Sequence, residues 1–580
     1  MKKFFYVFLL IASFSCTEKK QPSSNDFTTK FEKSEGTETT TYEETIAYYQ
    51  QLEATYPEIS IQEIGETDSG NPLHLVILSS TKEFNFKKLA SKTIILINNG
   101  IHPGESDGID ASMLFLRDLV QDSAKIKKLE NVVIAVIPVY NVGGSLNRNS
   151  TTRVNQNGPK EYGFRGNAQN YDLNRDFIKA DTKNARTFAK IFHLVNPDVF
   201  IDNHVSNGAD YQYAITHLFT QHNKLGNDLG IFIEDKMRPE MEASLLKKDI
   251  IITPYVNVWG TTPEAGFSQF FDSPRYSTGY TTLFNTLGMM IETHMLKPYK
   301  QRVEQTYAFM ESLLNFTIEN RIEIKTLRNN AVAQFLAKQT YPITYELDNS
   351  NFSILDFKGF EGSYIESKVT SGKRLFYDRS KPYTKPVNYY NQFVVSKEIK
   401  IPKAYILKQG WWKVLERLND NHIEYTVFKN DTTITVAEQH IKAYETSKIV
   451  YEGHYPHFNT SVKTSTKLMQ FNSGDIYIPV NQEGVRYIIE TLEASATDSF
   501  FNWNFFDTIL QQKEGYSAYV FEDIAEQFLI ENPFIRDSLS LKIKTDKAFA
   551  ENPRAQLDFV YKHSPYYETA YLKLPIYKVY

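Results

Sequence analysis

Two side chains that can bind a metal ion lie three residues apart in the first fifth of the chain. His102 and Glu105 flank Pro103-Gly104 in the segment HPGE. A neutral imidazole nitrogen and a carboxylate oxygen are both ligands that a catalytic zinc ion accepts. A bare H-x-x-E pattern also occurs in ordinary surface loops, so its surroundings decide how it is interpreted. His204, later in the chain, would complete a three-ligand set that leaves one metal position open for water.

The residues around this pair predict a strand, a turn and a helix. Thr93 to Ile97 is a short, β-branched apolar run, which is typical of a buried strand. Pro103-Gly104 predicts a tight turn. The helix that follows is predicted from apolar residues at helical spacing, namely Ile109, Met113, Leu114, Leu116 and Leu119. His102 and Glu105 are thus placed at the carboxyl end of a strand, where open α/β sheets bind ligands.

Two later strands each lead to a polar residue of the same kind. The strand predicted at residues 198–202 is followed by His204, and the strand at 288–291 is followed by Glu292. Predicted strands and helices alternate along this part of the chain, which favours an α/β fold with a mixed central sheet and helices on both faces. The other elements predicted here are a hairpin at 59–78, a strand at 132–139, and helices at 42–56, 182–195 and 302–318.

A polar loop from Asn141 to about Asp172 precedes the segment DLNRDF, which contains Asn174 and Arg175. A loop of this length inside a compact domain is uncommon and is often functional. Its arginines are Arg148, Arg153 and Arg165. The guanidinium group suits a planar carboxylate because it donates two parallel hydrogen bonds. Solvated loop charges are the alternative interpretation for any one of these arginines.

With these motifs in place, the chain resembles the zinc carboxypeptidases related to carboxypeptidase A, over about residues 42 to 320. HPGE, DLNR, His204 and Glu292 occur in the order found in that metallopeptidase family. The family is an established example of a two-histidine, one-glutamate zinc site. The resemblance implies one Zn²⁺ ion held by His102, Glu105 and His204, and a peptide substrate with a free C-terminal carboxylate.

The resemblance also implies a role for each of several further residues. Glu292 corresponds to the general base, and Arg153 to the arginine that polarises the scissile carbonyl. Asn174 and Arg175 correspond to the pair that holds the terminal carboxylate. The tyrosine that covers the substrate is expected to be Tyr280, which follows the flexible Ser-Thr-Gly segment.

Two of these assignments have a competitor, and so does the function as a whole. Arg165 is the alternative to Arg153, and Tyr276 is the alternative to Tyr280. The leading hypothesis is a zinc-dependent carboxypeptidase. A related zinc amidohydrolase acting on a non-standard amide, such as a peptidoglycan stem peptide, is the alternative enzyme. A binding lipoprotein of the cell envelope without turnover is the non-enzymatic alternative, although every expected ligand and Glu292 are present.

The N-terminus predicts export and a lipid anchor. Lys2-Lys3 precede a short apolar run, and Cys16 follows Ser15. A basic start and an apolar run too short to span a bilayer describe a signal peptide. Residues 1–16 resemble a bacterial lipoprotein signal, in which Cys16 becomes lipidated; plain secretion is the alternative. Residues 17–40 are polar and predict a flexible tether. The expected location is the bacterial cell envelope, with the membrane as a partner through the anchor.

The remaining composition sets broader limits. A chain of 580 residues is too long for one core, and its net charge of -5 gives no indication of a nucleic-acid partner. A domain at 41–320 and an accessory α+β region of unknown role at 321–580 are predicted. Short aromatic strands predict an antiparallel β-unit at 331–400, and residues from Gln482 onward are mostly helical in pattern. His454 and His457 are expected to be structural and not metal ligands.

Overall fold

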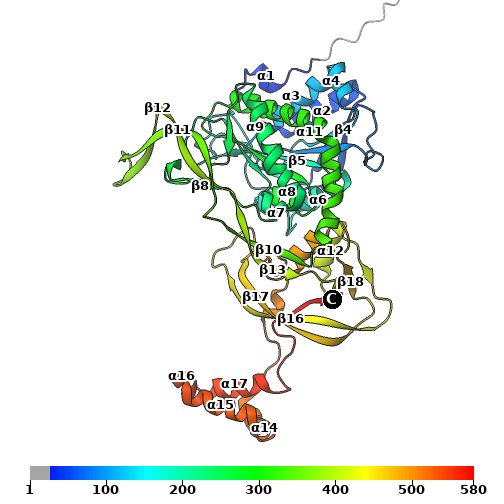
Figure 1. Cartoon of the computed structure of the whole chain (residues 1–580), viewed down its shortest axis with the longest axis vertical. Helices are drawn as coiled ribbons and strands as arrows, with labels where there is room; N and C mark the ends of the chain where they lie inside the picture. The colour runs from blue at the N-terminus through cyan, green and yellow to red at the C-terminus, as the bar shows by residue number, and fades with distance from the viewer. Residues whose placement is uncertain (1–25) are drawn as a thin grey trace, which may run out of the picture.

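The computed structural model describes residues 26–580. The predicted signal peptide at 1–16 and the lipidation site Cys16 lie outside the described residues. Three parts follow one another along the long axis of the molecule (Figure 1): an α/β unit coloured blue to green, a yellow β-rich region, and a red group of helices at the far end. Within residues 26–580, no helix combines the length and the apolar character needed to cross a bilayer.

An eight-stranded mixed sheet forms the centre of the α/β unit, with the order β1-β2-β4-β3-β5-β9-β6-β7. In this order the strands are Ile59–Glu66, Pro72–Leu78, Val132–Ile137, Thr93–Asn98, Val199–Ser206, Leu287–His294, Ile215–Phe219 and Ile252–Pro254. The four central strands β4, β3, β5 and β9 are parallel to one another. Their residues are almost all buried, because both faces of the sheet are covered, and this explains their continuous apolar sequences.

Helices cover both faces of this sheet. α3 (Asp107–Val120) connects β3 to β4, and α6 (Lys183–Val195) lies on the connection that returns from β4 to β5. Right-handed crossovers that run in opposite directions place their helices on opposite faces. α11 (Tyr299–Leu336) packs against α3, and α10 (Ser277–Thr282) packs against α6. The predicted fold class is therefore confirmed.

The last helix of the α/β unit is much longer than predicted. The sequence predicted a helix at 302–318 and a domain boundary at 320, whereas α11 continues to Leu336. Lys325 and Arg328, in its second half, form ion pairs of 2.9 and 2.6 Å with Asp198, which is fully buried at the foot of β5. The boundary at 320 thus falls inside a helix on which the α/β unit depends.

The second part of the segment predicted to be a tether, residues 17–40, is folded. Residues 27–40 are packed against the α/β unit, and Phe27 and Phe31 are both buried. Thr29 and Glu32 form a reciprocal capping box around the short helix α1 (Lys30–Lys33). The ring of Phe31 lies 5.8 Å from that of Tyr299. The polar composition of this segment did not indicate that Phe27 and Phe31 would be buried. Any flexible tether therefore ends before Phe27.

The rest of the chain forms two further β-structures and a helical group. The two-stranded sheet pairs β10 (Thr340–Leu347) with β13 (Phe393–Lys400), and the hairpin pairs β11 (Ser353–Glu366) with β12 (Lys373–Tyr390), which also contacts β8 (Phe267–Ser268). The six-stranded sheet contains β15 (Thr426–Val427), β18 (Ile476–Pro479), β14 (Ala404–Leu407), β19 (Lys573–Val579), β16 (Thr432–Thr446) and β17 (His457–Phe471), in that order.

The helices of this region are α12 (Trp412–Asp420), α13 (Val485–Leu492), α14 (Ala518–Glu531), α15 (Pro533–Thr545), α16 (Lys547–Ala550) and α17 (Pro553–His563). The helical pattern predicted after Gln482 is present, but it did not reveal β19. This strand returns from the helical group to a central position between β14 and β16.

Candidate metal centre

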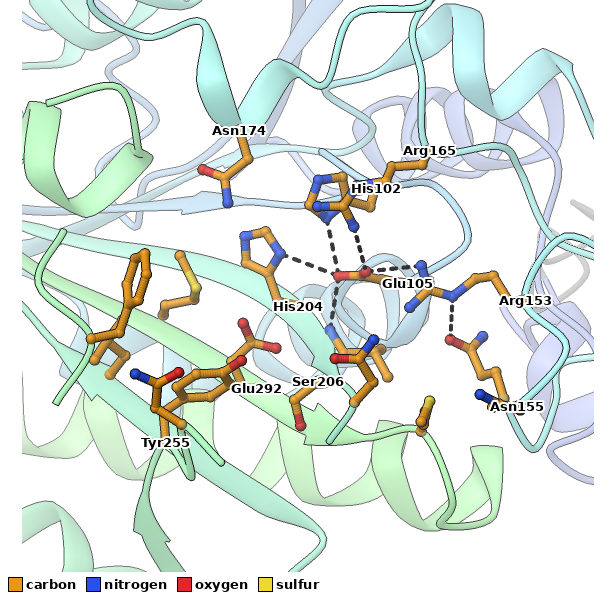
Figure 2. Close-up of a pocket in the computed structure, with 18 of the residues that line it drawn as sticks. His102, Glu105, Arg153, Asn155, Arg165, Asn174, His204, Ser206, Tyr255 and Glu292 are labelled. Atoms are coloured by element: carbon orange, nitrogen blue, oxygen red, sulfur yellow. Dashed lines mark hydrogen bonds and ion pairs between the residues drawn. The ribbon is translucent and has the colours of Figure 1, made fainter. Parts of the chain in front are cut away.

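His102, Glu105 and His204 come together at the carboxyl ends of β3 and β5 (Figure 2). His102 and Glu105 lie in the turn between β3 and α3, whereas His204 lies on β5. One ligand atom from each residue falls within 4.8 Å of the other two, and all three side chains are buried. Glu105 Oε2 lies 3.3 Å from His102 Nδ1 and 3.2 Å from His204 Nδ1. The three residues that the sequence singled out therefore form one compact donor set.

Each histidine ring is oriented by a carboxylate behind it. His102 Nε2 lies 2.8 Å from Asp172 Oδ1, and His204 Nε2 lies 2.9 Å from Asp202 Oδ2. Both rings thereby direct Nδ1 toward Glu105. A carboxylate behind a metal-binding imidazole fixes the ring and increases its basicity as a ligand. The sequence analysis missed both aspartates as site residues, although Asp202 is two residues before His204 and so shares its side of the strand.

The donor set fits a divalent metal ion. His102 Nδ1 is buried and makes no hydrogen bond to any described residue, as expected for an atom that is reserved for a ligand. Two imidazole nitrogens and one carboxylate are the ligands of open, three-residue zinc sites. The backbone N–H of Val205 donates to Glu105 Oε2 at 2.9 Å and so holds that carboxylate in place.

Nearby charges keep the Glu105 carboxylate ionised. Although burial favours its neutral form, Arg153 and His102 hold the pKa of Glu105 well below its usual range. Arg153 Nη1 is 2.9 Å from Glu105 Oε1. Burial likewise opposes a charged ring at His204, but Asp202 raises the pKa of His204 above its usual value. The site is thus a compact group of opposite charges.

Glu292 lies directly beside this donor set. It is on β9, and the sheet register pairs it with His204 across β5 and β9. Both strands extend beyond the predicted ends, so His204 and Glu292 lie within paired strands and not after them. Burial raises the pKa of Glu292 to about 8, with Glu105 adding to the effect and His204 opposing it. A carboxyl group whose pKa is near neutral suits proton transfer.

The arginine-rich loop supplies two guanidinium groups to the same cavity. Arg153 faces Glu105, and its Nε donates to Gln156 Oε1 at 2.6 Å. Arg165 Nη2 lies 2.9 Å from Asp172 Oδ2, and its Nη1 is 3.7 Å from Glu105 Oε1. Both arginines line the cavity, so the structure leaves both available for the role expected of Arg153. Arg153 is the more enclosed of the two, with 18% of its side chain exposed against 44% for Arg165.

Asn174 and Arg175 lie on another wall of the cavity, in a short 3₁₀ turn (Leu173–Arg175). Asn174 Oδ1 accepts a hydrogen bond of 3.3 Å from the backbone N–H of Ser277, and its side-chain nitrogen points into the cavity (Figure 2). The guanidinium carbon of Arg175 lies 4.5 Å from the centre of the Tyr276 ring. These two side chains can offer N–H donors to a carboxylate.

Tyr280, which was predicted to cover the substrate, does not line the cavity. Tyr280 is fully buried, and its hydroxyl donates to Asn421 Oδ1 at 2.6 Å. It lies one helical turn into α10, on the side that packs against Phe192 of α6. Tyr276, the alternative, immediately precedes α10 and lines the cavity.

The cavity has a volume of about 550 Å³. Its far wall comes from residues that the sequence analysis did not single out: Tyr255, Asn257, Trp259 and Phe270. No motif marks them, because they lie in an irregular segment after β7. His454 and His457 are not part of this site. They pair with Asp181 at 2.7 Å and with Asp507 at 3.0 Å, as expected for structural histidines.

The chain is similar to proteins named carboxypeptidase. Residues 45–198 match the family model described as zinc carboxypeptidase. Carboxypeptidase 2 of Trichophyton equinum is 21% identical over 463 residues, covering 75% of this chain and 78% of the relative. Carboxypeptidase 2 of Trichophyton rubrum is 21% identical over 504 residues, covering 80% of this chain and 84% of the relative.

Among solved structures, a metallo-carboxypeptidase from Burkholderia cenocepacia is similar at 17% identity and a TM-score of 0.35, covering 47% of this chain and 68% of that chain. Carboxypeptidase A from Helicoverpa armigera gives 14% identity and a TM-score of 0.36, covering 48% of this chain and 74% of that chain. The match of residues 45–198 to the zinc carboxypeptidase model, together with relatives named carboxypeptidase, indicates that the chain is a zinc hydrolase.

Proposed function

We propose that this protein is a zinc-dependent carboxypeptidase that removes the C-terminal residue of peptides. The observation that carries the proposal is the position of Asn174 and Arg175 in the cavity that also contains the metal-ligand set and Glu292. A guanidinium and an amide at one end of the cavity suit a substrate carboxylate. A carboxylate held there restricts attack to the bond nearest the chain end.

Each residue has a distinct part in this proposal. His102, Glu105 and His204 hold one zinc ion, which supplies Lewis-acid chemistry to the scissile carbonyl and to the attacking water. Glu292 accepts the proton from that water and returns it to the leaving amine. Arg153 donates hydrogen bonds to the oxygen that becomes negative in the transition state. Tyr276 is proposed to cover the substrate, since its ring stacks on Arg175 at the cavity wall.

The purified protein and a library of peptides test the proposal. The library is incubated with native protein, with protein treated with a chelator, and with treated protein to which zinc is returned, and the products are identified by mass. Release of single C-terminal residues that stops with the chelator and returns with zinc is expected. Amidated copies of the same peptides should resist cleavage. Internal cuts, or an absence of products, would refute the proposal; cleavage of peptidoglycan stem peptides alone would favour the amidohydrolase alternative.

We also propose that the chain is a lipoprotein of the bacterial cell envelope, anchored through Cys16. The support is in the sequence: Lys2-Lys3, a short apolar run and a cysteine preceded by serine. Residues 26 and beyond would then begin a short distance from the membrane, since Phe27 is already packed. Expression of the Cys16→Ala variant should move the protein out of the membrane fraction, whereas an unchanged distribution would contradict the anchor.

A further inference from the structure

A tight turn of the C-terminal region contacts the loop that carries Asn174 and Arg175. Glu452 Oε2 accepts a hydrogen bond of 2.8 Å from the backbone N–H of Asp172. His454 Nε2 lies 2.7 Å from Asp181 Oδ2, near the end of the same loop. Gly453 lies so close to Tyr171 that a Cβ atom there would be 2.7 Å from the tyrosine hydroxyl. The 451–454 turn is therefore fitted to this loop by three successive residues.

The backbone of the turn is unusual for a glutamate. Tyr451 and His454 exchange backbone hydrogen bonds of 2.8 and 3.0 Å, which leaves Glu452 and Gly453 as the two central residues. Glu452 has φ 48° and Gly453 has φ 77°. Two-residue turns with positive φ at both positions favour asparagine and glycine. A glutamate in the left-handed region is conformationally strained, and such strain concentrates where a side chain has a function.

Asp172, the residue that Glu452 contacts, also contacts the metal ligand His102 and the turn that contains Asn174 and Arg175. We call Asn174 and Arg175 the carboxylate clamp. Asp172 Oδ1 is 2.8 Å from His102 Nε2 and also accepts a hydrogen bond from the backbone N–H of Asn174 at 3.0 Å. Asp172 Oδ2 is 2.9 Å from Arg165 Nη2. A displacement of the Asp172 backbone would therefore move both the orientation of His102 and the 3₁₀ turn that presents the clamp.

The C-terminal region also supports the opposite side of the clamp. Arg275, which immediately precedes Tyr276, lies between the rings of Tyr451 and Trp503, 5.6 and 5.0 Å from their centres. Asp498 pairs with the Arg275 guanidinium at 2.6 Å and accepts its backbone N–H at 3.0 Å. Tyr276, the residue after Arg275, stacks on Arg175. Both the loop and the tyrosine that flank the clamp are thus held by residues from Tyr451 onward, which the α/β unit alone does not contain.

We propose that Glu452 is a positioning residue of the catalytic centre, acting through Asp172, and that the C-terminal region completes the site that binds the substrate carboxylate. This inference rests on the proposed carboxypeptidase function, because it assigns the subsite of the same cavity. It gives residues 404–510 a task that their sequence did not disclose: they fix the geometry of a site whose ligands all come from other parts of the chain.

Three variants of the full chain separate positioning from mere stability. Glu452→Asn suits the left-handed turn better than glutamate but is too short to reach Asp172. Glu452→Gln keeps an oxygen that can accept the same hydrogen bond. Glu424→Asn is the matched control, since Glu424 is an exposed residue of the same region. We measure KM and kcat with a peptide substrate, zinc affinity by competition with a chelator, and the midpoint of thermal unfolding.

The expected pattern is specific to positioning. Glu452→Asn should raise KM about tenfold and weaken zinc binding about tenfold, the lower end of the loss seen when outer-shell partners are removed. Its unfolding midpoint should equal or exceed that of the wild type. Glu452→Gln and Glu424→Asn should both keep the KM and the zinc affinity of the wild type. Wild-type KM and zinc affinity in Glu452→Asn, equal impairment of the Gln and Asn variants, or losses that parallel a lower unfolding midpoint would each overturn the inference.

A further measurement separates this inference from the proposed function. Binding of 3-phenylpropanoate, a simple aromatic carboxylate, is titrated by calorimetry to the zinc-loaded wild type and variants. If the wild type cleaves no peptide, the proposed function fails, while carboxylate and zinc binding still report on Glu452. If the wild type cleaves peptides but Glu452→Asn binds the carboxylate and zinc as tightly as the wild type, only the positioning inference fails.

Discussion

Replacing Asp202 with asparagine tests whether the metal centre depends on the carboxylate behind His204. Asp202 is fully buried, and its Oδ2 lies 2.9 Å from His204 Nε2. Its other oxygen accepts a 2.9 Å hydrogen bond from Asn98 Nδ2. An asparagine can satisfy only one of these donors, since its amide nitrogen must then face the other. Loss of one charge-assisted hydrogen bond costs about 1.5–3 kcal/mol, which weakens zinc binding by about 10–100-fold.

The assay is a zinc titration of metal-free Asp202→Asn against a competing chelator, with circular dichroism to verify the fold. Asp198→Asn is the matched control. Asp198 is equally buried and immediately precedes β5. It is four residues before Asp202, which corresponds to about 13 Å along an extended strand. The control should lose stability without a change in zinc affinity. Zinc binding by Asp202→Asn within about threefold of the wild type would refute the reasoning, because about 1.4 kcal/mol corresponds to tenfold.

Three further outcomes are expected. Glu292→Gln should retain zinc but lose about 10²–10⁴ in kcat; turnover at the wild-type rate would exclude Glu292 as the base. Tyr276→Phe should alter KM while Tyr280→Phe does not, because only Tyr276 lines the cavity, and the reverse result in peptide kinetics would contradict the structure. Burial raises the pKa of Asp110 to about 7, so the native state keeps a proton that the unfolded state loses between about pH 4 and 7. The free energy of unfolding should therefore fall as pH rises through that window, by about 2.5 kcal/mol between pH 5 and pH 8. In urea unfolding at pH 5 and pH 8, Asp110→Asn should lack this decrease, and an undiminished decrease would contradict the assignment.

The sequence was sufficient to predict the site residues that lie in a short motif or at the end of an apolar run. His102 and Glu105 lie in one turn, and His204 and Glu292 follow apolar runs whose parallel strands end at the same edge. The apolar pattern was therefore enough to predict that these four side chains lie near one edge of the sheet, although β5 and β9 extend beyond the predicted strand ends. The choice of Tyr280 over Tyr276 depended instead on a flexible Ser-Thr-Gly segment, whereas Ser277, Thr278 and Gly279 form the first turn of α10.

Long-range packing accounts for the other errors. Residues 27–40 look like a solvated tether because Phe27 and Phe31 are only two apolar residues in a polar stretch, yet each finds a buried place against the α/β unit. The second half of α11 buries only Ile324, Ala331 and Phe335, which are too widely spaced to form a regular apolar face. Glu452 illustrates the same limit, because nothing in its local sequence indicates that it reaches Asp172 from 280 positions away.

The continuity of α11 determines where this chain can be cut. A fragment that ends at residue 320 would lose Lys325 and Arg328, leaving the Asp198 carboxylate buried without either cationic partner. An uncompensated buried charge of this kind costs about 3–5 kcal/mol, a large share of the stability of a typical domain. The destabilised end of β5 belongs to the strand that carries His204. Any shortened form intended for crystallisation or engineering should therefore retain α11 through Leu336.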